Sequence, residues 1–430
     1  MKKQIKKMLL PVSRGVVANV ELPGSKSICN RALLMASLSS GVTILKNILF
    51  SDDVNSCVQA IKELGIRLDI NYQDRTVKVY GCSGEFSMKN ASLNMNDAGT
   101  LTRFLIPICA SQIGGVYHFH GSKRMMERPI SDLLKHIQSL GCRIEYLETD
   151  GCMPFKMYTN GLLGGKLTIE GDKSSQFLSG MLLASPLAKD LLTLSTNVTH
   201  NQPYVEMTKK MMADFGVNTS INGNNYEVPI GGYSSIEEYW IEPDISTASY
   251  FWAVAAITQG SIRVMNTSYS SLQGDIKFLE VLEKMGCTIT ETSKGIMVSM
   301  SKDLKSVNIN MRDFSDTFMT VLAIVSFTNE TSLISGLSHT RFQESNRIEA
   351  MGKELSKLGV NVKTTDDSIE VTTNQLSGAI VSGHNDHRIA MSLALIGLKI
   401  SGVIIDGAEC VSKTCPDFFE RMLDISDGYA

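Results

Sequence analysis

Clusters of polar and charged residues recur at the starts of six apolar segments of helical length. Lys26 and Arg31 follow Pro23-Gly24-Ser25, and Arg388 closes the run Asn385-Asp386-His387-Arg388. Backbone N–H groups and the helix dipole favour anions at such positions, whereas a cation there costs stability unless an anion is bound. The pattern therefore predicts that small anionic groups bind at these helix starts. The clusters are Pro23 to Arg31, Asn96 to Arg103, Ser174 to Gln176, Glu242 to Ser246, Asp313 to Asp316 and Asn385 to Arg388.

Three further segments concentrate charge just after predicted strands: Arg124 to Pro129, Thr340 to Arg347 and Lys413 to Pro416. Simpler explanations stay open for any one of these groups. Ser246 or Thr100 alone is equally well explained as a helix cap, and a charged helix start is often only a solvated face. Because the same placement recurs in each copy, we favour the interpretation that these residues together form a functional site.

Several familiar sites are not predicted. Gly24-Ser25-Lys26-Ser27 lacks the upstream glycine of a phosphate-binding loop, and neither a G-x-S-x-G nor a G-x-G-x-x-G pattern occurs. His118 and His120 would share one face of a strand, but no third ligand accompanies them, so we expect no metal site. The net charge of −3 argues against a general nucleic-acid-binding protein.

The composition indicates a cytoplasmic globular protein. Apolar residues make up 43% and charged residues 20% of the 430 residues. The nine cysteines show no C-x-x-C pair, which fits reduced thiols. The basic N-terminal start has too short an apolar run before Pro11 for an export signal, and no segment approaches the roughly 18 apolar residues of a membrane span.

The clusters repeat because the chain itself repeats six times. Five amphipathic segments end in a glycine, which suits the left-handed residue that closes a helix. These glycines, 70 to 76 residues apart, are Gly65, Gly141, Gly216, Gly286 and Gly359. The pattern within each copy predicts, in order, a strand, an apolar helix, a strand, an amphipathic helix and a hairpin. Helices that are apolar on all sides should be buried, so we expect two α/β domains of three copies each, divided near residue 241. A strand ahead of the first copy could complete the last one.

The ordered motifs are similar to those of the 5-enolpyruvylshikimate-3-phosphate synthase (3-phosphoshikimate 1-carboxyvinyltransferase) family. They are LPGSKSICNRAL, NDAGTLTRFL, RMMERPI, SSQF, QPYVEMT, EPDISTASYF, GDIKF, FSDTFMT, TRFQESNRIEAM, NDHRIAM and SKTCPDFF. The resemblance spans roughly residues 11–420 and implies an α/β fold of two similar domains. Each domain would contain three copies of a βαβαββ unit with buried parallel helices. The domains would be 22–241 and 1–21 plus 242–430, with the active site in the cleft between them.

The resemblance also implies the activity. An enzyme of this family transfers the enolpyruvyl group of phosphoenolpyruvate to the 5-hydroxyl of shikimate 3-phosphate and releases phosphate. The reaction serves the shikimate pathway to chorismate and the aromatic amino acids. It needs no metal or organic cofactor, and its partners are these two small-molecule substrates. A family that closes one chain over its own cleft further implies a monomer.

Site residues carry over motif by motif. Asp316 would be the base for the 5-hydroxyl, Glu344 the proton donor to the methylene carbon, and Lys26 a catalytic residue that touches both substrates. The implied contacts to shikimate 3-phosphate are Lys26, Ser27, Arg31, Ser174, Ser175, Gln176, Asn201, Tyr204, Asp316, His339 and Gln343. Those to phosphoenolpyruvate are Lys26, Gly99, Arg128, Gln176, Arg347, Arg388 and Lys413.

Two alternatives stay open at this point. Asn201, His339 and Gln343 depart from the commonest family pattern at the acceptor, so a different acceptor, such as a UDP-sugar or a cyclitol relative of shikimate, is a second hypothesis. The UDP-sugar branch carries a catalytic cysteine that the segment Gly121 to Arg128 lacks. A non-catalytic anion-binding relative is a third hypothesis. The presence of Asp316 and Glu344 argues against it.

Overall fold

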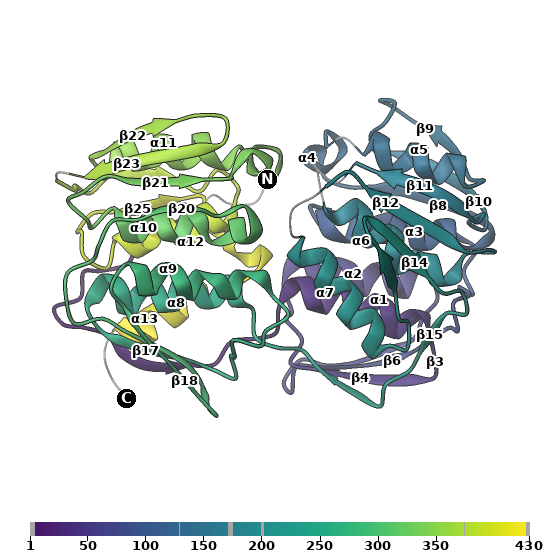
Figure 1. Ribbon diagram of the computed structural model, residues 1–430, viewed down its shortest axis with the longest axis horizontal. Coiled ribbons are helices and arrows are strands. Elements are labelled where there is room, and N and C mark those ends of the chain that lie inside the picture. Colours follow the sequence, from purple (N-terminus) through teal and green to yellow (C-terminus); the bar gives the residue numbers. More distant parts are fainter. Residues whose placement is uncertain (1–4, 129, 171–174, 199–201, 374, 427–430) are drawn as a thin grey trace. The chain divides into compact units, whose positions relative to one another are not determined.

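The N-terminal segment packs with the second half of the chain rather than with the residues that follow it. In this computed structural model, Met1–Leu22 and Glu242–Ala430 form one compact unit, unit 1, and Pro23–Ile241 forms the other, unit 2 (Figure 1). The structure describes residues 5–128, 130–170, 175–198, 202–373 and 375–426. Each unit is an α/β structure with its own buried helices.

Six helices are buried on almost every side, as their apolar sequences predict. Every residue of α8 and α10 is buried, and in α3 only Thr100 is not. Within unit 1, α10 packs against both α8 and α12, and within unit 2, α3 packs against α6. Each core is thus built around the helices whose first residues carry the polar clusters. The helices are α1 (Lys26–Leu38), α3 (Gly99–Ala110), α6 (Ser175–Ala184), α8 (Ile245–Thr258), α10 (Phe318–Val325) and α12 (His387–Ile396).

The second copy shows the repeated unit most completely. Strand β7 (Asn90–Asn94) is followed by α3 and then by β8 (Ile113–His120), which pairs with β7 in parallel. Helix α5 (Ser131–Ser139) then leads into the hairpin of β9 (Arg143–Tyr146) and β10 (Phe155–Asn160), and β10 pairs antiparallel with β8. The strand order is β7-β8-β10-β9. The predicted βαβαββ order is therefore confirmed in this copy.

The other two sheets of unit 2 have the same order of pairings. They are β11-β12-β14-β13 and β16-β4-β6-β5. Their strands are β11 (Gly165–Ile169), β12 (Leu192–Thr196), β14 (Asn225–Val228), β13 (Ser220–Asn222), β16 (Glu238–Trp240), β4 (Val42–Lys46), β6 (Thr76–Tyr80) and β5 (Leu68–Asn71). A short parallel pair joins β3 (Ser39–Ser40) to β15 (Tyr233–Ser234). Because β16 from the end of unit 2 pairs with β4 from its beginning, the three copies close in a cycle.

In unit 1 the N-terminal segment completes two copies, not the last one alone. Strand β2 (Val17–Val20) pairs in parallel with β17 of the fourth copy, and β1 (Lys6–Lys7) pairs antiparallel with β25 of the sixth. The sheet orders are β2-β17-β19-β18, β20-β21-β23-β22 and β1-β25-β24. The remaining strands are β17 (Ser261–Met265), β19 (Gly295–Ser299), β18 (Thr288–Thr292), β20 (Asn308–Asn310), β21 (Ser332–Ser335), β23 (Ser368–Thr373), β22 (Val360–Thr364), β25 (Ile404–Asp406) and β24 (Ile380–Ser382).

The second helix of each copy is amphipathic and buries only one face. These helices are α2 (Asp52–Glu63), α5 (Ser131–Ser139), α7 (Pro203–Asp214), α9 (Phe278–Lys284), α11 (Arg347–Lys357) and α13 (Phe418–Ser426). Five of them are closed by the predicted glycines, all of which have positive φ angles between 83° and 104°. Glycine adopts this left-handed conformation without the steric cost of a Cβ atom, so each helix ends and the chain turns into its hairpin.

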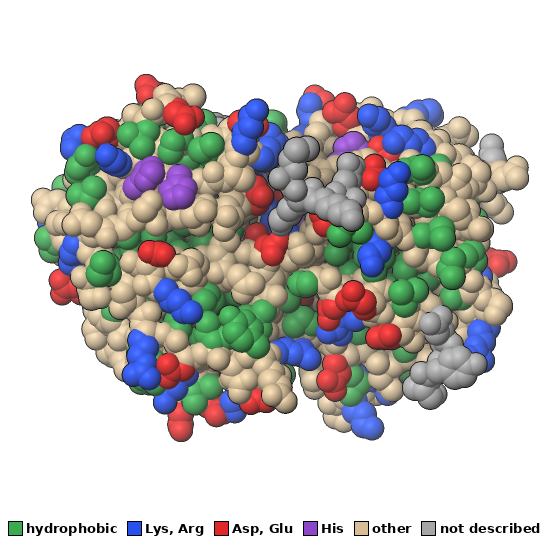
Figure 2. All heavy atoms as spheres, turned by 180° about the vertical axis from the view of Figure 1, so that it is seen from behind, with side chains coloured by type: hydrophobic (Ala, Val, Ile, Leu, Met, Phe, Trp, Pro, Cys, Tyr) green, Lys and Arg blue, Asp and Glu red, His purple; other side chains and the backbone are tan. Residues whose placement is uncertain are grey.

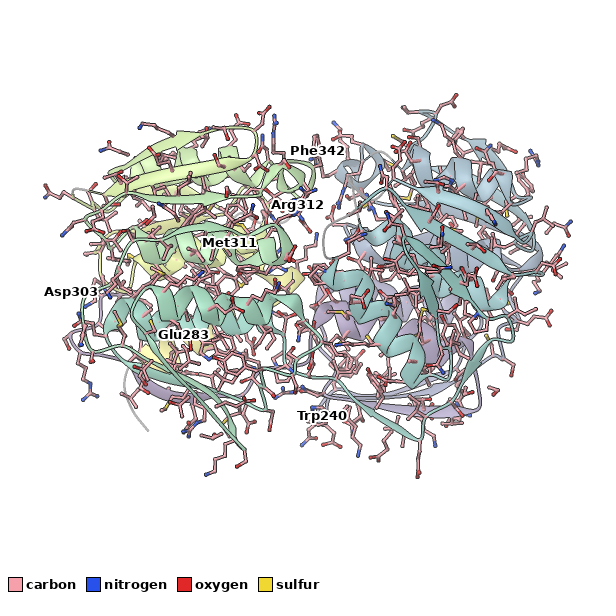
Figure 3. All side chains as sticks on the ribbon, in the orientation of Figure 1. Trp240, Glu283, Asp303, Met311, Arg312 and Phe342 are labelled. Carbon is pink, nitrogen blue, oxygen red and sulfur yellow. The ribbon has the colours of Figure 1, made fainter. Side chains whose placement is uncertain are left out.

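Short turns of 3-10 helix carry much of the polar sequence. They are η1 (Ser185–Leu187), η2 (Gly274–Lys277), η3 (Arg312–Thr317), η4 (Ser338–Phe342) and η5 (Ala408–Lys413), and a short helix, α4 (Lys123–Met126), lies in unit 2. In Figure 3, Arg312 of η3 and Phe342 of η4 lie at the same end of unit 1. These two turns lie in the fifth copy, where η3 precedes α10 and η4 precedes α11, so they bring side chains about 30 residues apart to one end of the unit.

The surface does not present one sign of charge. On the face that Figure 2 shows, Lys and Arg side chains are interspersed with Asp and Glu. Within the described residues, no helix is long and apolar enough to cross a membrane.

Candidate active site

Arg347, the first residue of α11, is the centre of a charged cluster in unit 1. Its Nε donates a hydrogen bond to Asp386 at 2.8 Å, one terminal nitrogen donates to Asp316 at 3.0 Å, and the other donates to Glu344 at 2.9 Å. The Arg347 side chain is only 2% exposed. Burial alone would lower the pKa of Arg347, but Asp386, Glu344 and Asp316 outweigh that effect and raise it. One guanidinium thus fixes three carboxylates relative to one another.

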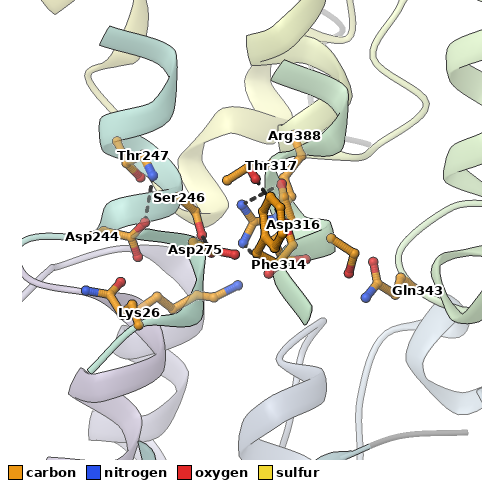
Figure 4. Close-up of polar contacts among 12 residues, drawn as sticks. Lys26, Asp244, Ser246, Thr247, Asp275, Phe314, Asp316, Thr317, Gln343 and Arg388 are labelled. Atoms are coloured by element: carbon orange, nitrogen blue, oxygen red, sulfur yellow. Dashed lines mark hydrogen bonds and ion pairs between the residues drawn. The ribbon is translucent and has the colours of Figure 1, made fainter. Parts of the chain in front are cut away.

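Asp316, the predicted base, lies in η3 between two arginines. Besides the contact with Arg347, its other carboxylate oxygen accepts a hydrogen bond at 2.7 Å from Arg388 (Figure 4). Arg388 lies in the first turn of α12, whose N-terminus is capped by Asp386. Each arginine donates a hydrogen bond to one oxygen of the carboxylate, so the two together fix the orientation of the Asp316 side chain.

Glu344, the predicted proton donor, is held by Arg347 and by a third cation. Lys413, the last residue of η5, places its Nζ 3.1 Å from the second carboxylate oxygen of Glu344. Both side chains are mostly buried, at 18% and 12% exposed. The structure therefore brings together five of the predicted residues in unit 1: Asp316, Glu344, Arg347, Arg388 and Lys413.

A second buried carboxylate, Asp275 of η2, belongs to the same surroundings but is absent from the residues predicted for the site. It accepts a short hydrogen bond from the Ser246 hydroxyl of α8 (Figure 4). Burial, together with the charge of Asp316, raises the pKa of Asp275 to about 7. Its motif, Gly274-Asp275-Ile276-Lys277, is visible in the sequence, but no local signal shows that its carboxylate lies near Asp316.

Two of the residues that depart from the family pattern adjoin this cluster. His339 of η4 and the Ser315 hydroxyl share a hydrogen bond of 2.7 Å, and burial lowers the pKa of His339, so the imidazole is neutral near pH 7. The amide oxygen of Gln343 accepts a short hydrogen bond from Arg347. The departures thus place neutral polar groups beside the charged cluster.

In unit 2, Lys26 and Arg31 lie on α1, whose N-cap residue Ser25 makes no side-chain capping bond. Lys26 forms an ion pair with Asp53 of α2 at 3.4 Å and is buried. No acidic residue occupies the first turn of α1. This helix start has backbone N–H groups and a cation, the combination that favours an anion.

Arg31 is fixed by its own unit. Its Nε donates to the Thr208 hydroxyl at 2.8 Å, and its terminal nitrogens donate to the carbonyl oxygens of Ser27 at 2.9 Å and Tyr204 at 3.2 Å. The guanidinium also lies 4.7 Å from the centre of the Phe104 ring. Burial lowers the pKa of Arg31 to about 10, so the group is still a cation at neutral pH. Arg31 therefore joins α1, α3 and α7 as well as contributing charge.

Gly99, at the start of α3, lets two arginines approach the backbone closely. A Cβ atom there would lie 2.6 Å from a terminal nitrogen of Arg128 and 3.1 Å from one of Arg103. Arg103 in turn donates to the Gly99 carbonyl at 2.9 Å. Gln176, in the first turn of α6, donates to the Thr100 hydroxyl at 3.2 Å. Gly99, Arg128 and Gln176 of the predicted set thus gather around the start of α3.

The remaining predicted residues are placed as follows. Ser175 begins α6, and Tyr204 lies in the first turn of α7. Ser174 and Asn201 lie outside the described residues. Ser246 is not the cap of α8, because Asp244 accepts the capping hydrogen bond from the backbone N–H of Thr247 at 2.8 Å.

No metal centre is found within the part of the chain that the structure describes, where no group of three or more His, Cys, Asp or Glu side chains could hold an ion. His118 and His120 do share one face of β8, with ring centres 5.0 Å apart. The His118 Nδ1 shares a hydrogen bond with the Ser92 hydroxyl at 3.2 Å. All nine cysteines are free thiols.

Two α/β units of repeated βαβαββ copies, with cations and carboxylates gathered at helix starts, define an enolpyruvyl transferase fold. The chain belongs to the family described as EPSP synthase (3-phosphoshikimate 1-carboxyvinyltransferase), whose family model matches residues 12–422. It is 36% identical over 416 residues to the 3-phosphoshikimate 1-carboxyvinyltransferase of Nostoc punctiforme, covering 96% of this chain and 97% of the relative. It is 39% identical over 421 residues to that of Shewanella loihica, covering 96% and 97%.

A solved structure shows the same fold. The EPSP synthase of Acinetobacter baumannii superposes with a TM-score of 0.83 at 22% sequence identity, covering 99% of this chain and 98% of that chain. The likeness confirms the predicted α/β fold class of the chain.

Proposed function

We propose that this protein transfers the enolpyruvyl group of phosphoenolpyruvate to the 5-hydroxyl of shikimate 3-phosphate and releases phosphate. The observation that carries the proposal is the position of Arg347, which holds Asp316 and Glu344 in one cluster with Arg388 and Lys413. Two carboxylates and three cations are what a reaction with two proton transfers and an anionic substrate requires.

In this reaction the cations bind the substrates' anionic groups. Arg347, Arg388 and Lys413 of unit 1 and Arg128 of unit 2 would bind phosphoenolpyruvate, with Gly99 leaving room beside Arg128. The proposed contacts to shikimate 3-phosphate are Lys26, Ser27, Arg31, Ser174, Ser175, Gln176, Asn201, Tyr204, His339 and Gln343. Lys26 and Gln176 are proposed to contact both substrates.

Asp316 and Glu344 carry the proton transfers. Asp316 takes the proton of the 5-hydroxyl as its oxygen forms a bond to C2 of phosphoenolpyruvate, and Glu344 gives a proton to C3. The product is a tetrahedral adduct. Glu344 then takes a proton back from C3, which restores the double bond as the C2–O bond to phosphate breaks, and Asp316 returns its proton to the departing phosphate. Protons and electrons balance with no cofactor.

The ion pairs of Glu344 bear on its role as an acid. With Arg347 and Lys413 on either side, its carboxylate form is favoured. An arriving phosphoenolpyruvate competes for these cations, because its carboxylate and phosphate together carry more negative charge than the Glu344 carboxylate. Substrate binding would thereby weaken the contacts that keep Glu344 ionised and let it take up the proton it must deliver.

The test is phosphate release from phosphoenolpyruvate, measured with and without shikimate 3-phosphate. Release that needs both substrates is expected for the native protein. Asp316→Asn should lower kcat by about 10²–10⁴, the usual contribution of a general base. Asp313→Asn, which removes a partly exposed carboxylate of the same turn paired with Lys277, is the matched control and should keep near-native kcat. Absence of release with shikimate 3-phosphate would overturn the proposed acceptor.

We also infer that the protein acts in the cytoplasm as a monomer. The family assignment supports the monomer, and the nine free cysteines fit a reducing compartment. Light scattering at micromolar concentration should give the mass of one chain, 47.1 kDa. A mass of twice this value would overturn the monomer.

A further inference from the structure

Glu354 is a fully buried carboxylate that the proposed reaction does not use. It lies in α11, and its side chain is 0% exposed. One of its oxygens accepts hydrogen bonds from the backbone N–H of Ser382 at 2.9 Å and from Lys357 at 2.5 Å. The other lies 2.8 Å from Nε2 of His384. Although burial acts to raise the pKa of Glu354, these donors outweigh it and lower the pKa, so the group is a buried anion with three partners.

Two of these partners lie at the turn between β24 and α12: Ser382 is the last residue of β24, and His384 is in the turn itself. His384 and Asn385 in this turn have positive φ angles of 51° and 54°. This left-handed conformation is uncommon for residues with a Cβ atom and persists only where surrounding contacts hold it. The contacts with Glu354 act directly on this part of the turn.

The next residue of the turn is Asp386, which connects it to the charged cluster. Asp386 caps α12 by accepting the backbone N–H of Arg388 at 3.1 Å, and it accepts Nε of Arg347 at 2.8 Å. Arg347 and Glu354 are seven residues apart on α11, two helical turns, and therefore lie on the same face of that helix. The helix thus holds the turn at two points, through Arg347 at one end and Glu354 at the other.

We propose that Glu354 is a positioning residue for phosphoenolpyruvate binding. By holding Ser382 and His384 it fixes the turn that carries Asp386, and so fixes the guanidinium groups of Arg347 and Arg388. The inference rests on the proposed function, because it assigns these two arginines to the anionic substrate. Loss of the Glu354 contacts lets the turn relax, and the arginines then spend less time in the geometry that phosphoenolpyruvate needs.

The test compares Glu354→Ala, Glu354→Gln and His384→Ala. Glu354→Ala should raise KM for phosphoenolpyruvate about tenfold or more, since small displacements of binding groups are costly. KM for shikimate 3-phosphate should change less than about twofold, because the displaced groups, Arg347 and Arg388, are assigned to phosphoenolpyruvate. Glu354→Gln should have a smaller effect, because its amide oxygen can still accept the Ser382 N–H. The double variant Glu354→Ala/His384→Ala should raise KM for phosphoenolpyruvate little more than Glu354→Ala alone, because both substitutions remove the same Glu354–His384 contact.

Lys357→Met is the matched control. It removes the third partner of Glu354, a side chain that is 40% exposed and lies outside the turn. It should leave both KM values near native. A purely structural role for Glu354 would instead lower kcat and raise both KM values together. That result would overturn the proposal. So would additive effects of the two alanine variants, or an unchanged KM for phosphoenolpyruvate in Glu354→Ala.

Amide hydrogen exchange separates this inference from the proposed function. Peptides covering residues 380–388 should exchange faster in Glu354→Ala than in the native protein, and at the native rate in Lys357→Met. Failure of the native protein to release phosphate would overturn the proposed function, while unchanged exchange in Glu354→Ala would overturn the positioning role. If Glu354→Ala does not fold, Glu354→Gln and His384→Ala carry the same measurements.

Discussion

The guanidinium of Arg347 donates a hydrogen bond at 3.0 Å to the carboxylate of Asp316, which lies 31 residues earlier in the chain. Its other terminal nitrogen holds Glu344 at 2.9 Å. The group proposed to accept a proton and the group proposed to donate one therefore share a single cation. Any substrate anion that binds Arg347 changes the electrostatic surroundings of both.

Proton uptake on phosphoenolpyruvate binding is the first expected consequence. If the substrate draws Lys413 and Arg347 away from Glu344, the carboxylate becomes easier to protonate. Binding can be measured calorimetrically in two buffers of different ionisation enthalpy, with an acceptor analogue that lacks the 5-hydroxyl so that no turnover occurs. The native protein should take up more protons than Glu344→Gln does. Equal uptake by the two proteins would contradict the proposed exchange of partners.

Asp275→Asn should change the pH dependence of stability. The folded pKa of Asp275, raised by burial and by Asp316 to about 7, lies above its unfolded value. The folded state therefore binds more protons between roughly pH 4 and pH 7, and the free energy of unfolding falls as the pH rises through that range. The variant stays neutral, so relative to the native protein it should gain roughly 4 kcal/mol between pH 4 and pH 8, about 1.4 kcal/mol for each unit of the pKa shift.

Urea denaturation at pH 4, 6 and 8 measures this difference. Asp303→Asn, which changes an exposed carboxylate in the same unit, provides the comparison and should follow the native pH profile. A native profile that rises from pH 4 to pH 8, with no difference in Asp275→Asn, would show that Asp275 is ionised throughout.

Gly99→Ala should weaken phosphoenolpyruvate binding. The added Cβ would lie 2.6 Å from Arg128, closer than van der Waals contact allows, so the guanidinium must move. KM for phosphoenolpyruvate is expected to rise about tenfold, because a displacement of this kind misaligns a charged contact. Gly114→Ala gives the comparison in steady-state kinetics: a Cβ there meets nothing within 4 Å, and the strain of alanine at a φ of 72° should lower stability while leaving KM near native. An unchanged KM in Gly99→Ala would remove Arg128 from the proposed contacts.

Arg31→Lys should destabilise unit 2 as well as affect acceptor binding. Lysine keeps the charge but cannot reach Thr208, Ser27 and Tyr204 together. The loss of buried hydrogen bonds is expected to lower the free energy of unfolding by about 2–4 kcal/mol. Urea denaturation measures this loss, and Thr208→Val, which removes only one of the three acceptors, should show a smaller one. A change in KM for shikimate 3-phosphate without any loss of stability would show that Arg31 serves binding alone.

Much of the fold follows from the sequence because its signals are local. A glycine such as Gly65 closes a helix wherever that helix packs, and a segment as apolar as α8 must be buried in any compact arrangement. Six apolar segments and five closing glycines, spaced by about one repeat length, predict the βαβαββ copies and their number. The helix starts with Lys26 and Arg388 were likewise visible, because a cation at a helix N-terminus is unfavourable without an anion.

Only the tertiary structure decided which of these local features meet. The N-terminal strands illustrate this for the fold: β2 completes the fourth copy and β1 the sixth, because a free strand pairs with whichever edge lies beside it. The Arg347–Asp316 pair, the buried Asp275 and the contact between Glu354 and His384 illustrate it for the site. Each joins side chains about 30 residues apart, and their approach depends on how whole helices and turns pack. Periodicity and capping carry no information about such contacts, since these arise only when separate elements share one core.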